Sequence, residues 1–299
     1  MAYYSGQAAS YQEILNTLVA ACTSQGWTWN NSVLSKDGIF LKLKAVPVAI
    51  VATGGTGQDA NGSLLNTASV IPCIGNMGYL PQFPVTYHLF VFEQEVYLKV
   101  RFDIDGYYYL AFGKSSLPLP ASGLWISGNT NYNWGSANNR KWIYVNENGG
   151  GYASQNDNIC IPLPFWADFG GSYYYIHQSS TILCGLDDVL WSSSTKLALF
   201  VRSLSPHQYR QPSTWNSDTV LTPFSIFLQR PSDKISQVAD FQNARYLRID
   251  NYEPEQIIEL GNEKWMVFPF YRKNITSRNG GQGIDHTGTF GWAIRYDGP

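Results

Sequence analysis

The chain has 299 residues, with 20 Lys and Arg residues against 22 Asp and Glu residues and a formal net charge of −2. Hydrophobic residues make up 44% of it and aromatic residues 15%, but charged residues only 14%, against about 25% in an ordinary soluble domain. This composition excludes collagen, coiled coils and disordered tails, and the near-neutral charge argues against a nucleic-acid partner, which would require a basic face.

One amphipathic helix is predicted near the N-terminus. Apolar residues recur at helical spacing, so that they line one face: Tyr11, Ile14, Leu15, Leu18, Val19 and Cys22. Ser10, followed three residues later by Glu13, has the pattern of a capping box, and Gly26 is typical of the position after a helix end. We expect this helix to pack on a sheet.

Strand patterns follow the helix. Residues 27–34 and 38–46 flank an Asp37-Gly38 turn of the kind that joins hairpins, and Val48 to Ala52 is a further short strand. Residues 53–84 are rich in Gly and Pro, and we interpret them as an extended arm or loop. Three more strands are predicted at 85–92, 95–102 and 107–112.

The second half of the chain alternates loop-rich and strand-like segments. Short strands are predicted at 142–145, 174–177, 181–184, 197–201, 224–228, 246–249, 265–270 and 289–295, with a weak helix at 234–243. The predicted fold class is α+β, mostly β, with the N-terminal amphipathic helix packed on antiparallel sheets and with long loops. We divide the chain into residues 1–114 (helix, sheet and the 53–84 loop), 115–195 (a looser, inserted β lobe) and 196–299 (strands that complete the core).

The sequence contains fragments of catalytic and ligand-binding motifs, none of them complete. Gly113-Lys114-Ser115 resembles the end of a phosphate-binding loop, but Tyr108 stands where that motif needs glycine. The Asp103 to Gly106 segment starts like a calcium loop and then departs from it. Asp285-His286 is an adjacent pair without a serine elbow, and capping of a turn is the favoured interpretation. We predict no catalytic, cofactor-binding or metal-binding residues, no cofactor and no enzymatic activity.

Other candidate chemistries rest on dispersed residues. The cysteines Cys22, Cys73, Cys160 and Cys184 form no CxxC pair, so free buried thiols are expected. Carboxylates that a glycosidase could use include Glu253 and Glu255, but the sequence cannot place any pair at the required separation. No apolar run approaches the roughly 18 residues of a transmembrane helix, so membrane insertion is not expected.

Two aromatic groups are candidates for binding. Tyr132, Trp134 and Trp142 lie among several asparagines, and this combination suits the apolar faces and hydroxyl groups of a glycan. In the last strand Phe290, Trp292 and Tyr296 alternate with small residues, and these three, together with Trp265, are the candidate interface residues.

Three segments of the chain resemble proteins encoded in the tail-structural regions of tailed bacteriophages. They are the opening Tyr3 to Gly6 with the helix as far as Trp27, the hairpin from Glu95 to Gly113, and the ending from Trp265 to Tyr296. That group is an uncharacterised family of virion proteins without a defined active site, so the resemblance carries no functional residue over to this chain.

The resemblance implies a structural subunit of the virion, in the tail or baseplate, that is made in the host cytoplasm. Its partners would be copies of itself, as a homo-oligomer, and other tail proteins. Low charge and abundant aromatic residues suit such protein–protein interfaces. Two alternatives stay open at this point: a surface module that recognises a bacterial glycan as receptor, and a head–tail neck or tail-terminator component.

Overall fold

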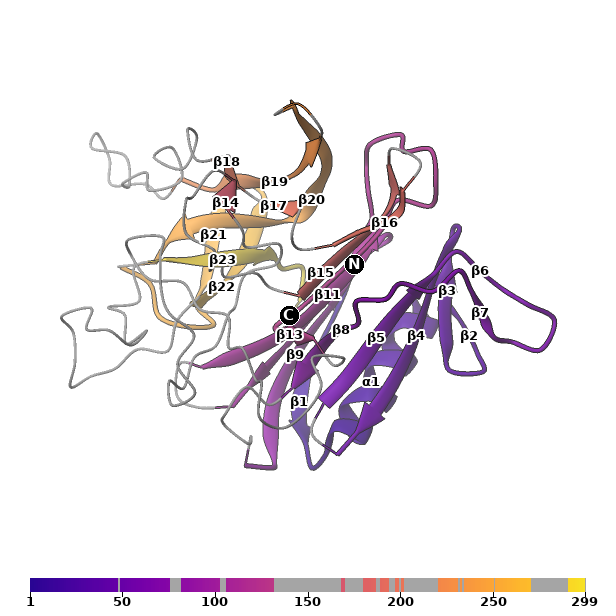
Figure 1. Cartoon of the computed structure of the whole chain (residues 1–299). Coiled ribbons are helices and arrows are strands. Elements are labelled where there is room, and N and C mark those ends of the chain that lie inside the picture. Colours follow the sequence, from indigo (N-terminus) through magenta and orange to yellow (C-terminus); the bar gives the residue numbers. More distant parts are fainter. Residues whose placement is uncertain are drawn as a thin grey trace, which may run out of the picture.

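The computed structural model describes residues 1–47, 49–75, 82–102, 106–131, 168–169, 180–186, 189–193, 197–198, 200–201, 220–230, 232, 234–249, 251–269 and 290–298. Within these ranges the protein consists mostly of β-strands in several antiparallel sheets, with one α-helix (Figure 1). The predicted mostly-β class is therefore confirmed. No helix in this part of the chain has the length and apolar character needed to cross a membrane.

Three larger sheets make up the body of the fold. The first sheet has the strand order β1 (Ala2–Ala8), β9 (Val85–Val91), β10 (Glu95–Arg101), β11 (Tyr107–Lys114), β12 (Leu124–Gly128), β15 (Ser180–Leu186) and β16 (Val189–Ser193). The second has the order β13 (Thr130–Asn131), β8 (Pro72–Gly75), β5 (Ala49–Gly55), β4 (Ile39–Val46), β3 (Val33–Lys36) and β2 (Thr28–Asn30). The third has the order β17 (Leu197–Ala198), β19 (Thr222–Arg230), β20 (Lys234–Arg248), β23 (Phe290–Arg295), β22 (Glu263–Pro269) and β21 (Ile257–Leu260).

Two small sheets accompany them. Strand β6 (Gly57–Gln58) pairs with β7 (Leu64–Leu65), and β14 (Asp168–Phe169) pairs in parallel with β18 (Phe200–Val201). The first sheet contains strands from both sides of residue 114, so the predicted first and second divisions share a sheet.

Helix α1 (Tyr11–Ser24) begins and ends where the sequence predicts. The Ser10 hydroxyl accepts a hydrogen bond from the backbone N–H of Glu13 at 3.2 Å, and the Glu13 carboxylate accepts one from the N–H of Ala9 at 2.7 Å. These contacts satisfy N–H groups that a helix start leaves without partners. Gly26 then adopts a φ of 83°, a conformation that glycine reaches without a steric cost.

The first sheet is the middle layer of the fold. One face packs against the second sheet and α1, in a core to which the helix contributes Ile14, Leu18 and Cys22. The other face packs against the third sheet in a core rich in aromatic residues, including Tyr97, Trp125 and Trp292. Figure 1 shows the third sheet on one side of this layer and the second sheet with α1 on the other.

The structure corrects the predicted helix at residues 234–243, because this segment is part of the long strand β20. The apolar residues Val238, Phe241 and Ala244 recur every three positions, which imitates a helical pattern. The pairing of β19 with β20 shifts register twice, between Pro223 and Ser225 and between Ile226 and Phe227. Such irregularities change which side chains face the core, so buried residues no longer alternate strictly.

The predicted arm at residues 53–84 is also corrected for its described part. Residues 53–75 contribute to β5, β6, β7 and β8 instead of extending from the body. Ala68 is buried, and its N–H donates to the carbonyl of Gly54 at 3.0 Å. The indole N–H of Trp191, on β16 of the first sheet, donates to the carbonyl of Asn66 at 2.8 Å. The segment therefore packs against the chain's own sheets.

Candidate functional site

Strand β10 carries charged side chains on a face that the third sheet covers. Glu95, Lys99 and Arg101 alternate along the strand, so they point to the same side of the first sheet. Glu95 is 2% exposed and Lys99 is fully buried. Charged residues are rarely buried without partners, so this face holds the candidate functional site.

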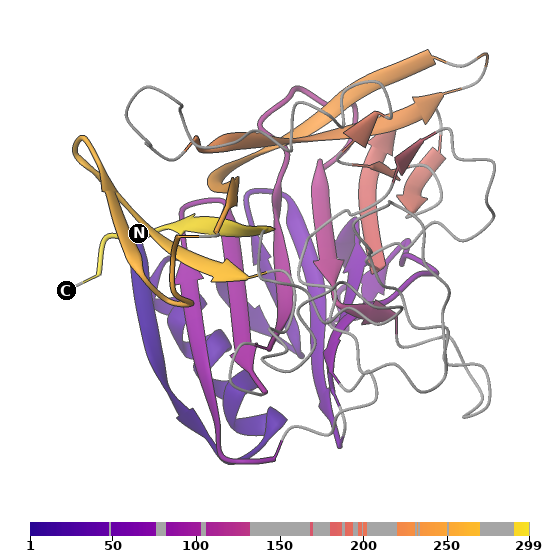
Figure 2. The same ribbon diagram turned by 90° about the vertical axis from the view of Figure 1, so that its left-hand side faces the viewer.

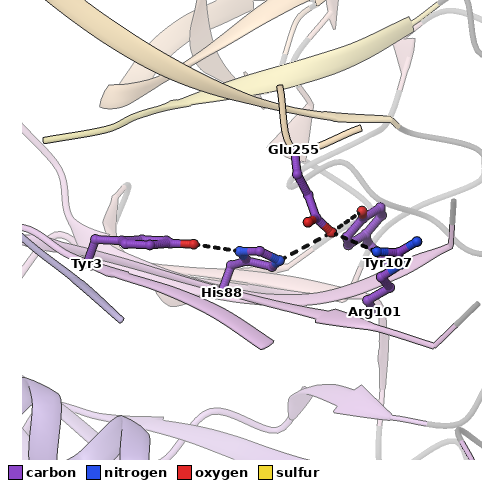
Figure 3. Close-up of polar contacts among 5 residues, drawn as sticks. All are labelled: Tyr3, His88, Arg101, Tyr107 and Glu255. Carbon is purple, nitrogen blue, oxygen red and sulfur yellow. Dashed lines mark hydrogen bonds and ion pairs between the residues drawn. The ribbon is translucent and has the colours of Figure 1, made fainter. Parts of the chain in front are cut away.

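The centre of the site is the carboxylate of Glu255, in the loop between β20 and β21. The Glu255 N–H donates to the carbonyl of Val267 on β22 at 2.7 Å, which holds the loop against the third sheet. The residue has a φ of 67°, an uncommon conformation for a residue other than glycine. From this position its carboxylate lies over the first sheet (Figure 3).

Three groups from three strands of the first sheet converge on one oxygen, Oε1 of Glu255. The Tyr107 hydroxyl on β11 donates to it at 2.5 Å, and a guanidinium nitrogen of Arg101 on β10 lies 3.4 Å away. Nε2 of His88 on β9 makes an ion-pair contact at 3.3 Å (Figure 3). His88 is 5% exposed, whereas the Glu255 side chain is 27% exposed. The carboxylate thus joins three strands to the third sheet at the boundary with solvent.

A fourth strand joins the cluster through Tyr3 on β1. Its hydroxyl lies 2.8 Å from Nδ1 of His88, so both imidazole nitrogens have neighbours within the site. The Tyr3 ring also contacts that of Tyr296, which follows β23, with 4.9 Å between the centroids. We call Tyr3, His88, Arg101, Tyr107 and Glu255 the inter-sheet cluster.

The surroundings shift the pKa values of two members of the inter-sheet cluster in opposite directions. Partial burial would raise the pKa of Glu255, but hydrogen bonds with His88 and Tyr107 and electrostatic interactions with His88 and Arg101 outweigh it, and the net pKa is lowered. For Tyr3, burial raises the pKa of the hydroxyl. Glu255 is therefore ionised at neutral pH, whereas Tyr3 keeps its proton.

The inter-sheet cluster has the order of groups found in nucleophilic catalysis, a carboxylate next to an imidazole next to a hydroxyl. That chemistry requires a hydroxyl that can pass its proton to the imidazole as it attacks a substrate. Here the hydroxyl belongs to a tyrosine whose raised pKa makes proton loss less favourable. The geometry supports a structural role for the inter-sheet cluster, because its contacts hold the loop before β21 on the first sheet.

We expect the Glu255→Gln substitution to change stability in a pH-dependent way. A carboxylate whose folded-state pKa lies below its ordinary value of 4.5 stabilises the fold above that value, and this contribution is lost as pH falls through the folded-state pKa. At pH 7 the variant should be about 1 kcal/mol less stable, a modest loss because solvent screens a partly exposed carboxylate.

Urea unfolding at several pH values tests this expectation, with Glu253→Gln, an exposed neighbour on the same loop, as the matched control. As pH falls through the folded-state pKa, the Glu255 side chain becomes protonated in the folded as well as the unfolded chain, and the stability difference between wild type and Glu255→Gln should shrink. A difference that is independent of pH would contradict the charge-based explanation.

A second contact between the first and third sheets is built around Glu95. Its carboxylate accepts hydrogen bonds from the backbone N–H groups of Gln242 and Asn243, at 2.8 and 3.0 Å. It also accepts from the Asn243 side chain at 2.7 Å and from the Tyr97 hydroxyl at 3.0 Å. Gln242 and Asn243 lie where the register of β20 shifts and have no partner residue in the described strand pairs. The carboxylate thus binds two N–H groups that the bulge leaves outside the ladder.

Lys99 lies between these two contacts, surrounded by aromatic rings. Its ammonium nitrogen is 4.3 Å from the ring centroid of Trp292 and 5.3 Å from that of Phe268. The rings of Tyr107 and Tyr109 are each 5.7 Å away. Attraction between a cation and the faces of aromatic rings offsets part of the cost of burying the charge.

The predicted interface residues are core residues of this chain. Trp292 is fully buried and Tyr296 is 5% exposed, both between the first and third sheets, whereas Trp265 is 2% exposed within a smaller cluster that includes Val267 and Ala293. Their side chains therefore have almost no surface to offer a partner, which corrects that assignment. The backbone of Phe290 belongs to β23, but its side chain is outside the described part.

Several other predicted positions lie outside the described residues. They are the glycan candidates Tyr132, Trp134 and Trp142, the pair Asp285 and His286, and Cys160. The other three cysteines, Cys22, Cys73 and Cys184, are free and buried as predicted. Burial raises the pKa of the Cys22 and Cys73 thiols, which makes them poor nucleophiles. Among the described residues, no group of three or more His, Cys, Asp and Glu side chains could hold a metal ion.

Comparison of the chain with models of known protein families and with curated proteins finds no match.

The inter-sheet cluster was not predicted from the sequence, because its members come from four strands and one loop. Glu255 was considered only for a carboxylate pair, and no motif links it to His88 or Tyr3. One signal was present in the sequence, since the strand-like segment at 95–102 places Glu95, Lys99 and Arg101 on the same face. Without knowledge of the third sheet, such a face is interpreted as exposed.

Proposed function

We propose that this protein is a non-enzymatic structural subunit of a tailed-bacteriophage virion, a tail or baseplate component that acts through contacts with its own copies and with other tail proteins. The sequence resemblance described above suggests the virion. The observation that carries the proposal of intersubunit contact is the exposed apolar edge of the third sheet.

Strand β21 forms that edge. Ile257 and Leu260 are 39% and 37% exposed, and among the described strands β21 pairs only with β22. Figure 2 shows the β21–β22 hairpin in light orange projecting at the left, and the β19–β20 hairpin projecting at the top. Proteins usually protect an edge strand with charges, because its free backbone groups can pair with another chain. Here Glu259 is the only charged residue of the strand.

The three segments that carry the resemblance meet in one part of the fold. Strand β1 contacts the end of β23 through Tyr3 and Tyr296, and β10 contacts β23 through Tyr97 and Trp292, with 5.9 Å between the ring centroids. The described parts of these three segments are therefore in contact with one another. The contacts among the segments that carry the resemblance support the proposal independently of the exposed edge at β21.

The test combines solution association with imaging of intact particles. We expect the purified protein to self-associate in light scattering, and the double substitution Ile257→Lys and Leu260→Lys to weaken association by about tenfold or more, because it places charges in an apolar contact. Leu65→Lys, which changes a leucine on β7 that is 44% exposed, is the control. A stable wild-type monomer that is also missing from every particle would overturn the proposal.

A further inference from the structure

A concave site lies where α1 meets the second sheet, on the opposite side of the first sheet from the inter-sheet cluster. Its cavity has a volume of about 440 Å³, within the range of small-ligand pockets. Helix α1 lies beside β4 in Figure 1. The cavity is lined by Gln12, Leu15, Asn16, Val19, Ala20, Trp29, Ser32, Leu43, Lys44 and Ala45.

The lining separates into an apolar floor and a polar rim. Leu15 and Leu43 are buried at the base, and the half-buried Trp29 supplies an aromatic surface. The rim consists of the exposed neutral side chains of Gln12, Asn16 and Ser32, with Lys44 as its one charged group.

The rim amides are held in place before any ligand binds. Gln12 and Asn16 are one helical turn apart, and Nε2 of Gln12 donates to Oδ1 of Asn16 at 2.9 Å. This bond leaves the carbonyl oxygen of Gln12 as an acceptor and the amide N–H groups of Asn16 as donors. A neighbouring donor and acceptor of this kind suit adjacent hydroxyl groups, each of which can both donate and accept.

The third rim residue is positioned by a tight turn. Asn31 and Ser32 have φ values of 48° and 64°, and left-handed conformations at both central positions are typical of a two-residue hairpin turn. The Ser32 carbonyl accepts a hydrogen bond from the N–H of Leu43 at 2.9 Å, which fixes the turn against β4. Preorganisation of this kind reduces the entropy that a ligand must lose on binding.

We propose that this cavity binds a neutral saccharide, through stacking on Trp29 and hydrogen bonds to Gln12, Asn16 and Ser32. A sugar ring has apolar C–H faces and a rim of hydroxyls, which match the floor and the rim of the cavity. A phosphorylated ligand would need more cationic groups than Lys44 alone, and a lipid chain would make no hydrogen bonds with the rim amides. The inference goes beyond the proposed function and does not depend on it.

Saturation-transfer NMR of the full chain with methyl glucoside, methyl galactoside and N-acetylglucosamine tests the proposal, followed by titration of any sugar that binds. We expect at least one to bind, and Asn16→Ala to weaken it about five- to tenfold, as the loss of one or two hydrogen bonds implies. Trp29→Ala should abolish binding and Trp29→Phe should retain part of it. Because Trp29 also packs on the core, thermal unfolding checks that each variant folds.

Asn262→Ala, at an exposed turn of the third sheet, is the matched control and should bind the sugar as the wild type does. Trp134→Ala distinguishes sugar binding in this cavity from binding to the aromatic group predicted from the sequence, and should leave binding in the cavity unchanged. Two results would overturn the proposal: no sugar binds, or binding persists in Asn16→Ala and is lost in Trp134→Ala.

Discussion

The Trp292→Ala substitution should lower the free energy of unfolding of the isolated chain by about 3–5 kcal/mol, the usual cost of removing a large buried aromatic side chain. Trp292 is fully buried, and its ring packs against those of Tyr97, Tyr109 and Phe224 at centroid distances of 5.9, 5.8 and 6.3 Å. Its loss would leave a cavity between the first and third sheets, and the ammonium group of Lys99 would lose its nearest aromatic ring.

Guanidinium chloride unfolding of the purified variant measures this effect, and Trp292→Phe, which keeps an aromatic ring, should cost less. The experiment also separates two roles for the last strand. If Trp292 served mainly as intersubunit surface, as the sequence alone suggests, the stability of the monomer would hardly change while association would weaken. That result would contradict the packing described here.

The Glu95→Ala substitution should be similarly severe, with an expected loss of about 3–5 kcal/mol, because it breaks a buried hydrogen-bonded group. Without the carboxylate, the N–H groups of Gln242 and Asn243 would lose their acceptor, and the pocket that holds the buried Glu95 side chain would be left empty. Glu263→Ala, at the exposed start of β22, is the matched control and should change stability by less than about 0.5 kcal/mol. An equal effect of both substitutions in urea unfolding would show that the Glu95 contacts contribute little.

The pH dependence of Glu95 should be opposite in sign to that of Glu255. Burial raises the pKa of Glu95, and the hydrogen bonds from Gln242, Asn243 and Tyr97 offset this only in part. The folded protein therefore binds the proton more tightly than the unfolded chain does. The resulting stabilisation is fully present below the ordinary value of 4.5 and is lost as pH rises through the folded-state pKa. The difference in free energy of unfolding between the wild type and Glu95→Gln should accordingly shrink as pH rises from the ordinary pKa through the folded-state pKa of Glu95.

Local sequence patterns were sufficient for the helix and for most strands. The face of α1, its capping residues Ser10 and Glu13, and the hairpin at Asp37-Gly38 all depend on neighbouring residues, so their physical cause lies within a few positions of the chain. Strand β1 was missed because Tyr3 to Gln7 contains few apolar residues, and its partner β9 lies far along the chain.

The candidate sites depended on contacts between distant elements. His88 and Glu255 face each other only because the loop before β21 is held on β22 and the third sheet packs on the first. The saccharide cavity likewise needs α1, the turn at Ser32 and strand β4 to come together. No spacing within the sequence encodes such a juxtaposition, because the elements concerned are joined by long connections.

Strand β10 shows most clearly which features the sequence determines and which depend on the tertiary structure. The sequence predicted a strand at residues 95–102, in which Val96, Leu98 and Val100 share one face because the side-chain period of a strand is two. Only the tertiary structure decided that the charged face is buried as well. That burial requires donors from the bulge in β20 and aromatic rings from the third sheet, because a charge removed from water is tolerated only where such partners replace its hydration.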